Sequence, residues 1–258
     1  MNKILPAFIA GIALLLIACN TNKVNNSNPV GADSTHPPVE TKAANTSYKP
    51  AFPGQTRIAG VTTSSPYDAK MLNDKLTRPW GIACLPDGRF LITEKGGDMR
   101  IASIDGSLGA PIKGQPAVNS SGQGGLLGIT LDPAFPDNRM VYWTFSLNSP
   151  EGNMTAVAKG RLSDDEKQIE NASVIFRATP AYNGTLHYGS RIVFDKQGNI
   201  IFSTGERSDL QTRPQAQQLN SDLGKVIRIT TEGKPAAGNP FLNTGGARPE
   251  LYLSLIHI

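Results

Sequence analysis

The feature that most constrains the fold is a short unit that recurs three times: an apolar strand, a turn containing aspartate, and a second apolar strand. The three copies begin at Gly81, Gly128 and Gly189, and their starts are separated by 47 and 61 residues. This spacing is close to the length of a four-stranded propeller blade with its connecting loop. Radial repetition also protects strand edges that would otherwise invite aggregation. The repeat therefore predicts about three consecutive blades of a β-propeller.

The strand pattern agrees with this interpretation. Between Leu76 and Ile229 short runs rich in β-branched and aromatic residues alternate with Gly, Pro, Asp and Asn, and no long helical period occurs. Such a pattern predicts an all-β protein of antiparallel hairpins. A β-sandwich is the main alternative, but the blade-like spacing favours the propeller. The predicted strands are residues 81–85, 90–94, 99–103, 127–131, 141–145, 155–160, 174–177, 191–194, 200–203 and 225–229.

The first 19 residues have the three parts of an export signal. Lys3 supplies positive charge, residues 4–17 are almost wholly apolar, and the Leu-Ile-Ala-Cys string ending at Cys19 resembles the bacterial lipobox. The apolar run suits a signal core better than a membrane-spanning helix of about 20 residues. We therefore expect an exported lipoprotein, lipidated at Cys19 and facing the periplasm or the cell exterior. The alternative is an ordinary cleaved signal with an incidental cysteine.

Three further segments follow from composition. Residues 20–53 contain almost no large apolar side chain, which predicts a disordered tether. Residues 54–252 are the predicted propeller part. Residues 253–258 resemble a translated adapter sequence, so we expect a non-native tail. Because three blades cannot close a ring, we expect about the first half of a propeller.

Charge and cysteine content exclude some classes. The net charge of +4 is small and the Lys and Arg residues are scattered, which argues against a nucleic-acid partner. Beyond Cys19 the only cysteine is Cys84, so the fold cannot depend on a disulfide. The apolar run around Cys84 predicts a buried thiol.

Three stretches carry side chains suited to chemistry. His187 is the only histidine in the predicted propeller and directly precedes a strand, although a lone histidine is more often structural. Gln123 lies in the glycine-rich residues 120–128, whose backbone could approach a flat ligand or simply connect two blades. Glu206 follows a predicted strand at a turn, where a solvated carboxylate is the alternative.

Together these stretches resemble the pyrroloquinoline-quinone-dependent aldose sugar dehydrogenases over about residues 76–252. The resemblance lies in the order of four motifs: RPWGIACLPDGRFLITEK, GQGGLLGITLDPAF, HYGSRIVFDKQGNIIFSTGE and LNSDLGKVIRITTEGKPAAGNPF. It implies a six-bladed propeller of four-stranded antiparallel blades. It also implies two cofactors, pyrroloquinoline quinone over the central mouth and a calcium ion that holds it, with an aldose sugar stacked above.

The resemblance also implies roles for individual residues. His187 would act as the general base that takes the proton of the anomeric hydroxyl, while the anomeric hydrogen passes as hydride to the quinone and a lactone forms. Glu206 stands where the family more usually has an aspartate that orients the histidine. Gln123 matches a glutamine near quinone and substrate, and Arg191 is a candidate for holding the acidic cofactor, with a structural ion pair as the alternative.

The expected function is thus a quinoprotein oxidoreductase that passes electrons to an external acceptor or the respiratory chain. The family's calcium and main quinone ligands match positions beyond residue 252, so no metal ligand is assigned and the fragment itself is expected to be inactive. Two other classes stay open. A calcium-dependent lactonase would need carboxylates and asparagines from several blades around a central metal. A non-catalytic propeller would bind carbohydrate or protein.

Overall fold

The computed structural model describes residues 37–44, 46–52, 55, 57, 59–61 and 64–254. The chain divides into two units, Met1–Ala69 and Lys70–Ile258. The described residues of the first unit contain no helix or strand, and one isolated bridge pairs Pro38 with Ala59. The predicted signal segment with Cys19 lies outside the described residues. In the part of the chain that is described, no helix has the length and apolar character needed to cross a membrane.

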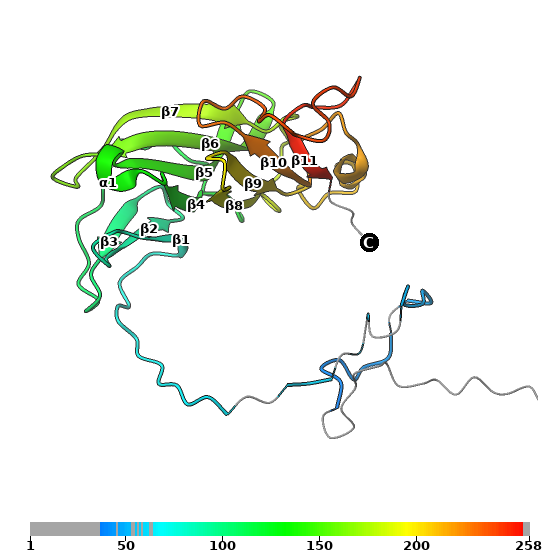
Figure 1. Ribbon diagram of the computed structural model, residues 1–258, viewed down its shortest axis with the longest axis horizontal. Coiled ribbons are helices and arrows are strands. Elements are labelled where there is room, and N and C mark those ends of the chain that lie inside the picture. Colours follow the sequence, from blue (N-terminus) through cyan, green and yellow to red (C-terminus); the bar gives the residue numbers. More distant parts are fainter. Residues whose placement is uncertain are drawn as a thin grey trace, which may run out of the picture. The chain divides into compact units, whose positions relative to one another are not determined.

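The second unit consists of three antiparallel sheets in which each strand pairs with the next along the chain (Figure 1). The first sheet contains β1 (Pro79–Cys84), β2 (Phe90–Glu94) and β3 (Met99–Ala102). The second contains β4 (Leu126–Leu131), β5 (Met140–Ser149), β6 (Gly152–Leu162) and β7 (Ile169–Arg177). The third contains β8 (Gly189–Phe194), β9 (Ile200–Thr204), β10 (Lys225–Ile229) and β11 (Leu251–Ser254). Two short helical segments, α1 (Phe135–Asn138) and η1 (Arg213–Gln217), lie in connections.

The sheets are arranged as consecutive blades of a β-propeller. Their first strands lie side by side, because β1 packs against β4 and β4 packs against β8. The prediction of an all-β fold with antiparallel sheets is confirmed, and two of the three sheets have four strands. The count of six blades stays a prediction. The same holds for the non-native tail, since Leu253 and Ser254 belong to β11 and residues 255–258 lie outside the description.

Two hydrophobic cores fill the spaces between neighbouring sheets. Successive side chains of a strand point to opposite faces, so the second sheet contributes to both cores. Trp143 and Phe145 of β5 lie in the core shared with the first sheet, whereas Tyr142 lies in the core shared with the third. Burying each such large apolar side chain contributes about 1.5–3 kcal/mol. This double burial fixes the strand register, because a slip of one residue would exchange the two faces.

Two buried threonines connect neighbouring sheets. The hydroxyl of Thr93 in β2 donates to the carbonyl of Leu127 in β4 at 2.6 Å, and that of Thr144 in β5 donates to the carbonyl of Ser190 in β8 at 2.7 Å. Each hydroxyl also accepts the N–H of a glycine in the first strand of its own sheet. That glycine must lack a side chain, because a Cβ at Gly128 would lie 2.1 Å from the Ser190 carbonyl oxygen.

In the third sheet, the position equivalent to Gly81 and Gly128 lies two residues after the predicted Gly189. In each sheet one isoleucine of the first strand pairs with the second strand: Ile82 with Ile92, Ile129 with Trp143, and Ile192 with Phe202. The residues that precede these isoleucines are therefore equivalent, namely Gly81, Gly128 and Arg191. The predicted start at Gly189 was wrong, because the third sheet carries an arginine where the first two carry glycine.

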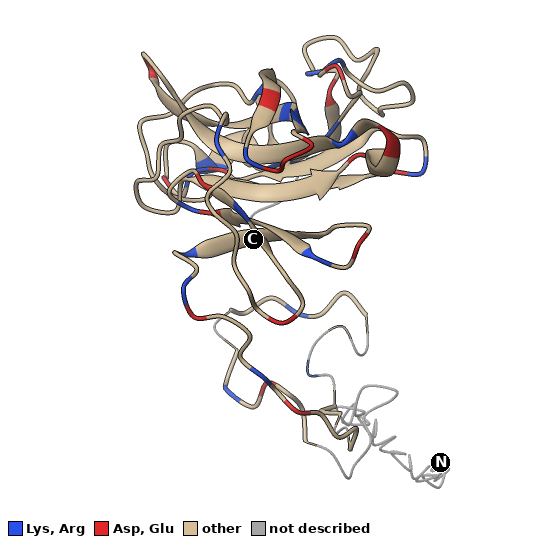
Figure 2. Ribbon diagram, turned by 90° about the vertical axis from the view of Figure 1, so that its left-hand side faces the viewer, with Lys and Arg blue, Asp and Glu red and all other residues tan. Residues whose placement is uncertain are grey.

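Cys84 is exposed, so the prediction of a buried thiol was wrong. Cys84 ends β1, and Ile82, two residues earlier and hence on the same face, is 59% exposed. The apolar run therefore has one buried and one uncovered face. Figure 2 shows that Lys and Arg residues are interspersed with Asp and Glu residues over the loops and strand ends.

Candidate active site

A pocket of about 370 Å³ lies beside the first strands of the three sheets. Its lining comes from β1 and the residue after β2, from β4 and the loop that enters it, and from β8 and the loop that enters it. The lining residues are Trp80, Lys95, Gly122, Gln123, Leu127, His187, Tyr188 and Gly189. The fold thus brings together Gln123 and His187, two of the residues predicted to form a site.

His187 and Glu206 form the central pair of this site. The Nδ1 atom of His187 lies 2.7 Å from Oε1 of Glu206, and the backbone N–H of Ser208 donates to the same oxygen at 3.1 Å. When Glu206 is ionised its carboxylate only accepts hydrogen bonds; Nδ1 then carries the hydrogen, and Nε2 of a neutral imidazole has a free lone pair. The imidazole is 43% exposed while the Glu206 side chain is 5% exposed. The alternative of a solvated turn carboxylate is therefore excluded.

The backbone around this pair is unusual for the residue types involved. His187 has a φ of 45°, in the left-handed region that a residue with a side chain seldom adopts. In the turn that follows β9, a Cβ at Gly205 would lie 1.9 Å from the His187 carbonyl oxygen. Gly205 therefore lets the turn after β9 approach the histidine closely, which places Glu206 beside the ring.

Gln123 supports the histidine as well as lining the pocket. The side-chain Oε1 of Gln123 accepts the backbone N–H of His187 at 2.9 Å. The backbone N–H of Gln123 donates to the Thr185 carbonyl at 2.7 Å. With Oε1 used in this way, the side-chain NH₂ group is left to donate to a ligand.

Arg191 does not line the pocket but reaches one of its walls. Its guanidinium lies 5.0 Å from the ring centroid of Trp80, which is cation–π distance. The described partner of the Arg191 guanidinium is thus an aromatic ring and not the carboxylate that an ion pair would require.

Three residues at the site were missed by sequence reasoning. Trp80 and Lys95 line the pocket, and Nζ of Lys95 donates to the Gly122 carbonyl. Both occur in the motif RPWGIACLPDGRFLITEK, but sequence spacing does not reveal that this motif meets residues 120–128 in space. The third, Arg207, is buried behind His187. An arginine directly after the turn glycine and glutamate gives no sequence signal of burial.

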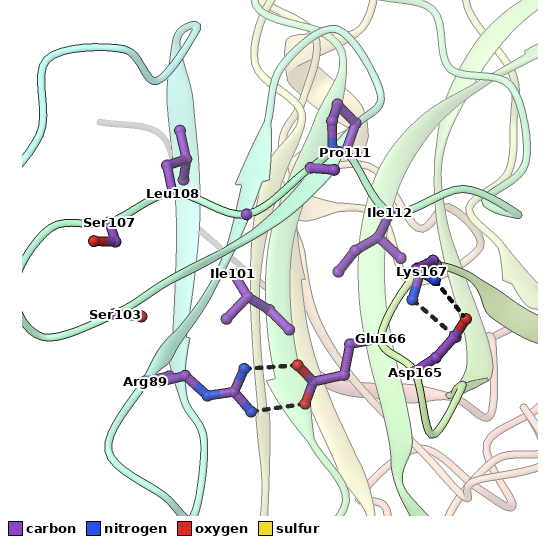
Figure 3. A pocket seen from close by; sticks show the side chains of 12 residues that line it. Arg89, Ile101, Ser103, Ser107, Leu108, Pro111, Ile112, Asp165, Glu166 and Lys167 are labelled. Carbon is purple, nitrogen blue, oxygen red and sulfur yellow. Dashed lines mark hydrogen bonds and ion pairs between the residues drawn. The ribbon is translucent and has the colours of Figure 1, made fainter.

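A second cavity, of about 410 Å³, lacks comparable chemistry. There the Arg89 guanidinium donates to both carboxylate oxygens of Glu166 at 2.6 and 2.7 Å. Nζ of Lys167 lies 3.4 Å from Oδ2 of Asp165 (Figure 3). The hydrogen bonds from Arg89 hold the pKa of Glu166 below its usual value, despite partial burial. These charges neutralise one another and no imidazole is present, so we place the functional site in the pocket that contains His187.

The described residues contain no cluster of the side chains that most often bind metals. Among them there is no group of three or more His, Cys, Asp or Glu side chains that could hold an ion. The predicted calcium ion therefore has no side-chain ligand set in the described part of the chain, and the calcium requirement stays a prediction.

The fold agrees with the comparisons with known proteins. Residues 76–255 match the glucose/sorbosone dehydrogenase family, and the chain belongs to this family of oxidoreductases. Aldose sugar dehydrogenase YliI of Escherichia coli (strain K12) is 38% identical over 187 residues, which cover 72% of this chain and 50% of that protein.

Two solved structures show the same fold. The apo form of the soluble aldose sugar dehydrogenase from Escherichia coli has a TM-score of 0.67 at 38% identity, over 70% of this chain and 52% of that chain. The PQQ-bound form of the aldose sugar dehydrogenase from Streptomyces coelicolor has a TM-score of 0.59 at 30% identity, over 70% and 52%. The chain thus spans about half the length of the relatives it matches.

Proposed function

We propose that the full-length protein is a quinoprotein oxidoreductase that converts aldose sugars to lactones. Electrons leave the reduced cofactor, pyrroloquinoline quinone, for an external acceptor or the respiratory chain. The observation that carries the proposal is the 2.7 Å contact between His187 Nδ1 and Glu206 Oε1 at the edge of a pocket, in a chain of a sugar dehydrogenase family. This pair provides a positioned proton acceptor, which the oxidation of a hydroxyl requires.

His187 takes the proton of the anomeric hydroxyl on Nε2. The imidazole then carries a positive charge, and the Glu206 carboxylate stabilises this charge from the Nδ1 side. Because Glu206 is buried, its attraction is less screened than it would be in water. Glu206 also fixes the tautomer, so that the lone pair of Nε2 is available before the sugar arrives.

The residues around the pocket fit a flat, anionic cofactor. The Trp80 indole offers an aromatic surface, Lys95 and Arg191 offer positive charge, and the Gln123 amide offers hydrogen-bond donors. We propose that these four side chains contact pyrroloquinoline quinone. When bound, the cofactor supplies the hydride acceptor, a role for which no side chain is suited.

We also propose that the protein is exported and held at a membrane through a lipid on Cys19. Sugar oxidation would then take place in the periplasm or at the cell exterior. The motif ending at Cys19 supports this location.

The proposal is tested by dye reduction with the full-length protein expressed without its signal. Glucose and other aldoses are supplied with and without pyrroloquinoline quinone and calcium. We expect reduction that requires both the sugar and the quinone, and a kcat about 100-fold to 10,000-fold lower in His187→Ala. The matched control is His36→Ala, which lies outside the region that matches the family and should retain full activity.

Two outcomes contradict the proposal. Failure of the wild-type protein both to oxidise any sugar and to bind the quinone would favour a non-catalytic binding propeller. Hydrolysis of lactones with calcium alone would favour the lactonase alternative.

A further inference from the structure

Arg207 is a buried cation directly behind the candidate base. The residue is only 2% exposed, and burial lowers the pKa of its guanidinium. Within the described part of the chain, the hydrogen bonds of this guanidinium go to neutral oxygens instead of carboxylates. Burying a charge costs free energy unless the charge is hydrogen-bonded. The acceptors of these hydrogen bonds therefore indicate which segments Arg207 stabilises.

The guanidinium joins two segments that are far apart in sequence. Its Nε donates to the Leu186 carbonyl at 3.0 Å, and its Nη1 donates to the Asn153 carbonyl at 3.0 Å. Its Nη2 donates to Oδ1 of Asn153 at 2.6 Å and also to the Gly184 carbonyl. Its Cζ lies 4.1 Å from the ring centroid of Tyr188, whose hydroxyl donates to the same Asn153 Oδ1 at 2.6 Å.

These bonds complete the fixing of the loop that carries His187. Each of the five consecutive carbonyls from Gly184 to Tyr188 accepts a hydrogen bond from another segment. In order, the donors are Arg207 Nη2, the Gln123 N–H, Arg207 Nε, the Arg207 backbone N–H and the Thr155 hydroxyl. Arg207 thus provides three of the five donors, and the two residues that flank His187, Leu186 and Tyr188, both contact its guanidinium.

We propose that Arg207 is a positioning residue for His187. Glu206 holds the imidazole ring, and the adjacent Arg207 holds the backbone in the left-handed conformation that presents Nε2 to the pocket. This inference rests on the proposed role of His187 as the base. It assigns the buried charge a task in catalysis beyond general support of the fold.

The geometry explains why the residue is an arginine. A guanidinium has five N–H groups in a rigid plane and can bond carbonyls on two segments at once, whereas the lysine ammonium is a point charge on a flexible chain. In Arg207→Lys the charge is kept, but the Leu186 and Gly184 carbonyls cannot both be held together with Asn153. The loop is then free to move the imidazole.

The first test compares Arg207→Lys with Arg228→Lys in the full-length protein. Arg228 is also buried, and its Nε bonds Oδ2 of Asp195 at 2.7 Å, but it makes no described bond to residues 184–188. Since a displacement of about 1 Å can cost about 100-fold in rate, we expect kcat for sugar oxidation to fall about 10-fold to 100-fold in Arg207→Lys, with KM changed less than about threefold. In Arg228→Lys we expect a similar loss of Tm with kcat unchanged. Equal kcat losses in both variants would overturn the proposal.

A double mutant separates positioning from general support. If Arg207 acts only through the imidazole, Arg207→Lys should lower kcat no further in a His187→Ala background. Multiplicative losses in the double mutant would assign Arg207 to the fold alone.

A readout independent of activity keeps the two proposals distinguishable. The Nδ1–H of His187 facing Glu206 should give a downfield proton resonance in the wild type and in Arg228→Lys, and this resonance should broaden or vanish in Arg207→Lys. An unchanged resonance in Arg207→Lys would contradict positioning even if the protein oxidises no sugar. Should Arg207→Lys fail to fold, Asn153→Ala removes one acceptor of the guanidinium and should weaken the same signal.

Discussion

Residues 205–207 act on His187 in three different ways. Gly205 lets the chain approach, Glu206 binds Nδ1 of the ring, and the Arg207 backbone N–H lies 3.4 Å from the His187 carbonyl oxygen that it bonds. Because these residues are consecutive, one turn after β9 sets both the direction of the imidazole and its tautomer. The turn is therefore as much a part of the candidate site as the loop that carries the histidine.

Glu206→Gln is predicted to lower kcat about 100-fold to 10,000-fold with little change in KM, because the amide can keep a hydrogen bond to Nδ1 but cannot stabilise the imidazolium. Steady-state kinetics of the full-length protein check this. Glu250→Gln is the matched control, since Glu250 is also buried but bonds Arg248 and does not line the pocket. A kcat within threefold of the wild type in Glu206→Gln would remove Glu206 from the mechanism.

Lys225 allows a prediction about pH. Its ammonium is buried and donates to the carbonyls of Gln215, Ala216 and Leu223 at 2.7–2.8 Å. Burial lowers its pKa to about 8, although the charge of Asp222 opposes the shift. The unfolded chain therefore binds more protons above about pH 8, and the free energy of unfolding should rise with pH by at most about 1.4 kcal/mol per pH unit towards pH 10.

The measurement is urea unfolding of the wild type and Lys225→Met between about pH 8 and pH 10. The difference between the two curves isolates the contribution of Lys225 from that of the other titrating groups. Lys225→Met should also be less stable by about 1–3 kcal/mol at pH 8, because three buried carbonyls lose their donor. Parallel pH curves for the two proteins would show that folding does not lower the pKa of Lys225.

Sequence reasoning found the site residues unevenly. His187 stood out as the only histidine of the propeller, and the family motifs pointed to Glu206 and Gln123, which the structure brings into contact with it. Arg207 could not be found in this way. The hydrogen-bond partners of Arg207 lie at residue 153 and in residues 184–186, far from it in sequence. Loops whose backbone carbonyls bind a buried cation have no periodic sequence pattern.

At the scale of strands, prediction worked where a glycine or a polar turn delimits the apolar run. Strand β10 has the predicted bounds, Lys225–Ile229, because glycine and a polar turn delimit it. Strands β5 and β6 extend further than predicted, to a hairpin end where Ser149 pairs with Gly152. These end residues are polar and are ordered by pairing rather than burial. Strand β11 was not predicted, because its last two residues belong to the segment 253–258 that was expected to be a non-native tail.

The threonine contacts between sheets are predicted to be a main determinant of blade packing. In Thr144→Val the shape is retained, but the Gly128 N–H and the Ser190 carbonyl lose their buried partner. We expect a loss of about 1–3 kcal/mol in the free energy of unfolding. Thr130→Val is the control, since this half-buried threonine in β4 should change stability by less than about 0.5 kcal/mol. Similar effects of both substitutions would show that the inter-sheet bond contributes little.

At the scale of the whole molecule, the repeat predicted the architecture but not its extent. The side-by-side order of β1, β4 and β8 follows from the recurring unit. The count of six blades and the calcium ion come from the family resemblance alone. The chain spans about half the length of the relatives it matches, and both stay predictions.

Cys19 is predicted to determine the location of the protein. When the full-length protein is expressed in a bacterial host, the wild type should sediment with membranes and incorporate labelled palmitate, and Cys19→Ser should do neither. Cys84→Ser is the control, because its exposed thiol lies within the folded unit and should leave labelling unchanged. Palmitate incorporation into Cys19→Ser at the wild-type level would contradict the lipid anchor.

Arg191 has a consequence for the symmetry of the fold. Identical blades around an axis would present the same groups at every angle, and such a centre could not tell one face of a bound molecule from another. At the position where the first two sheets have glycine, the third has a side chain that extends to Trp80 of the first sheet. This one departure from the repeat makes the first strand of the third sheet different from those of the other two. The Arg191 guanidinium of the third sheet therefore gives the centre a positive charge on one side, in a fixed position relative to the His187 loop.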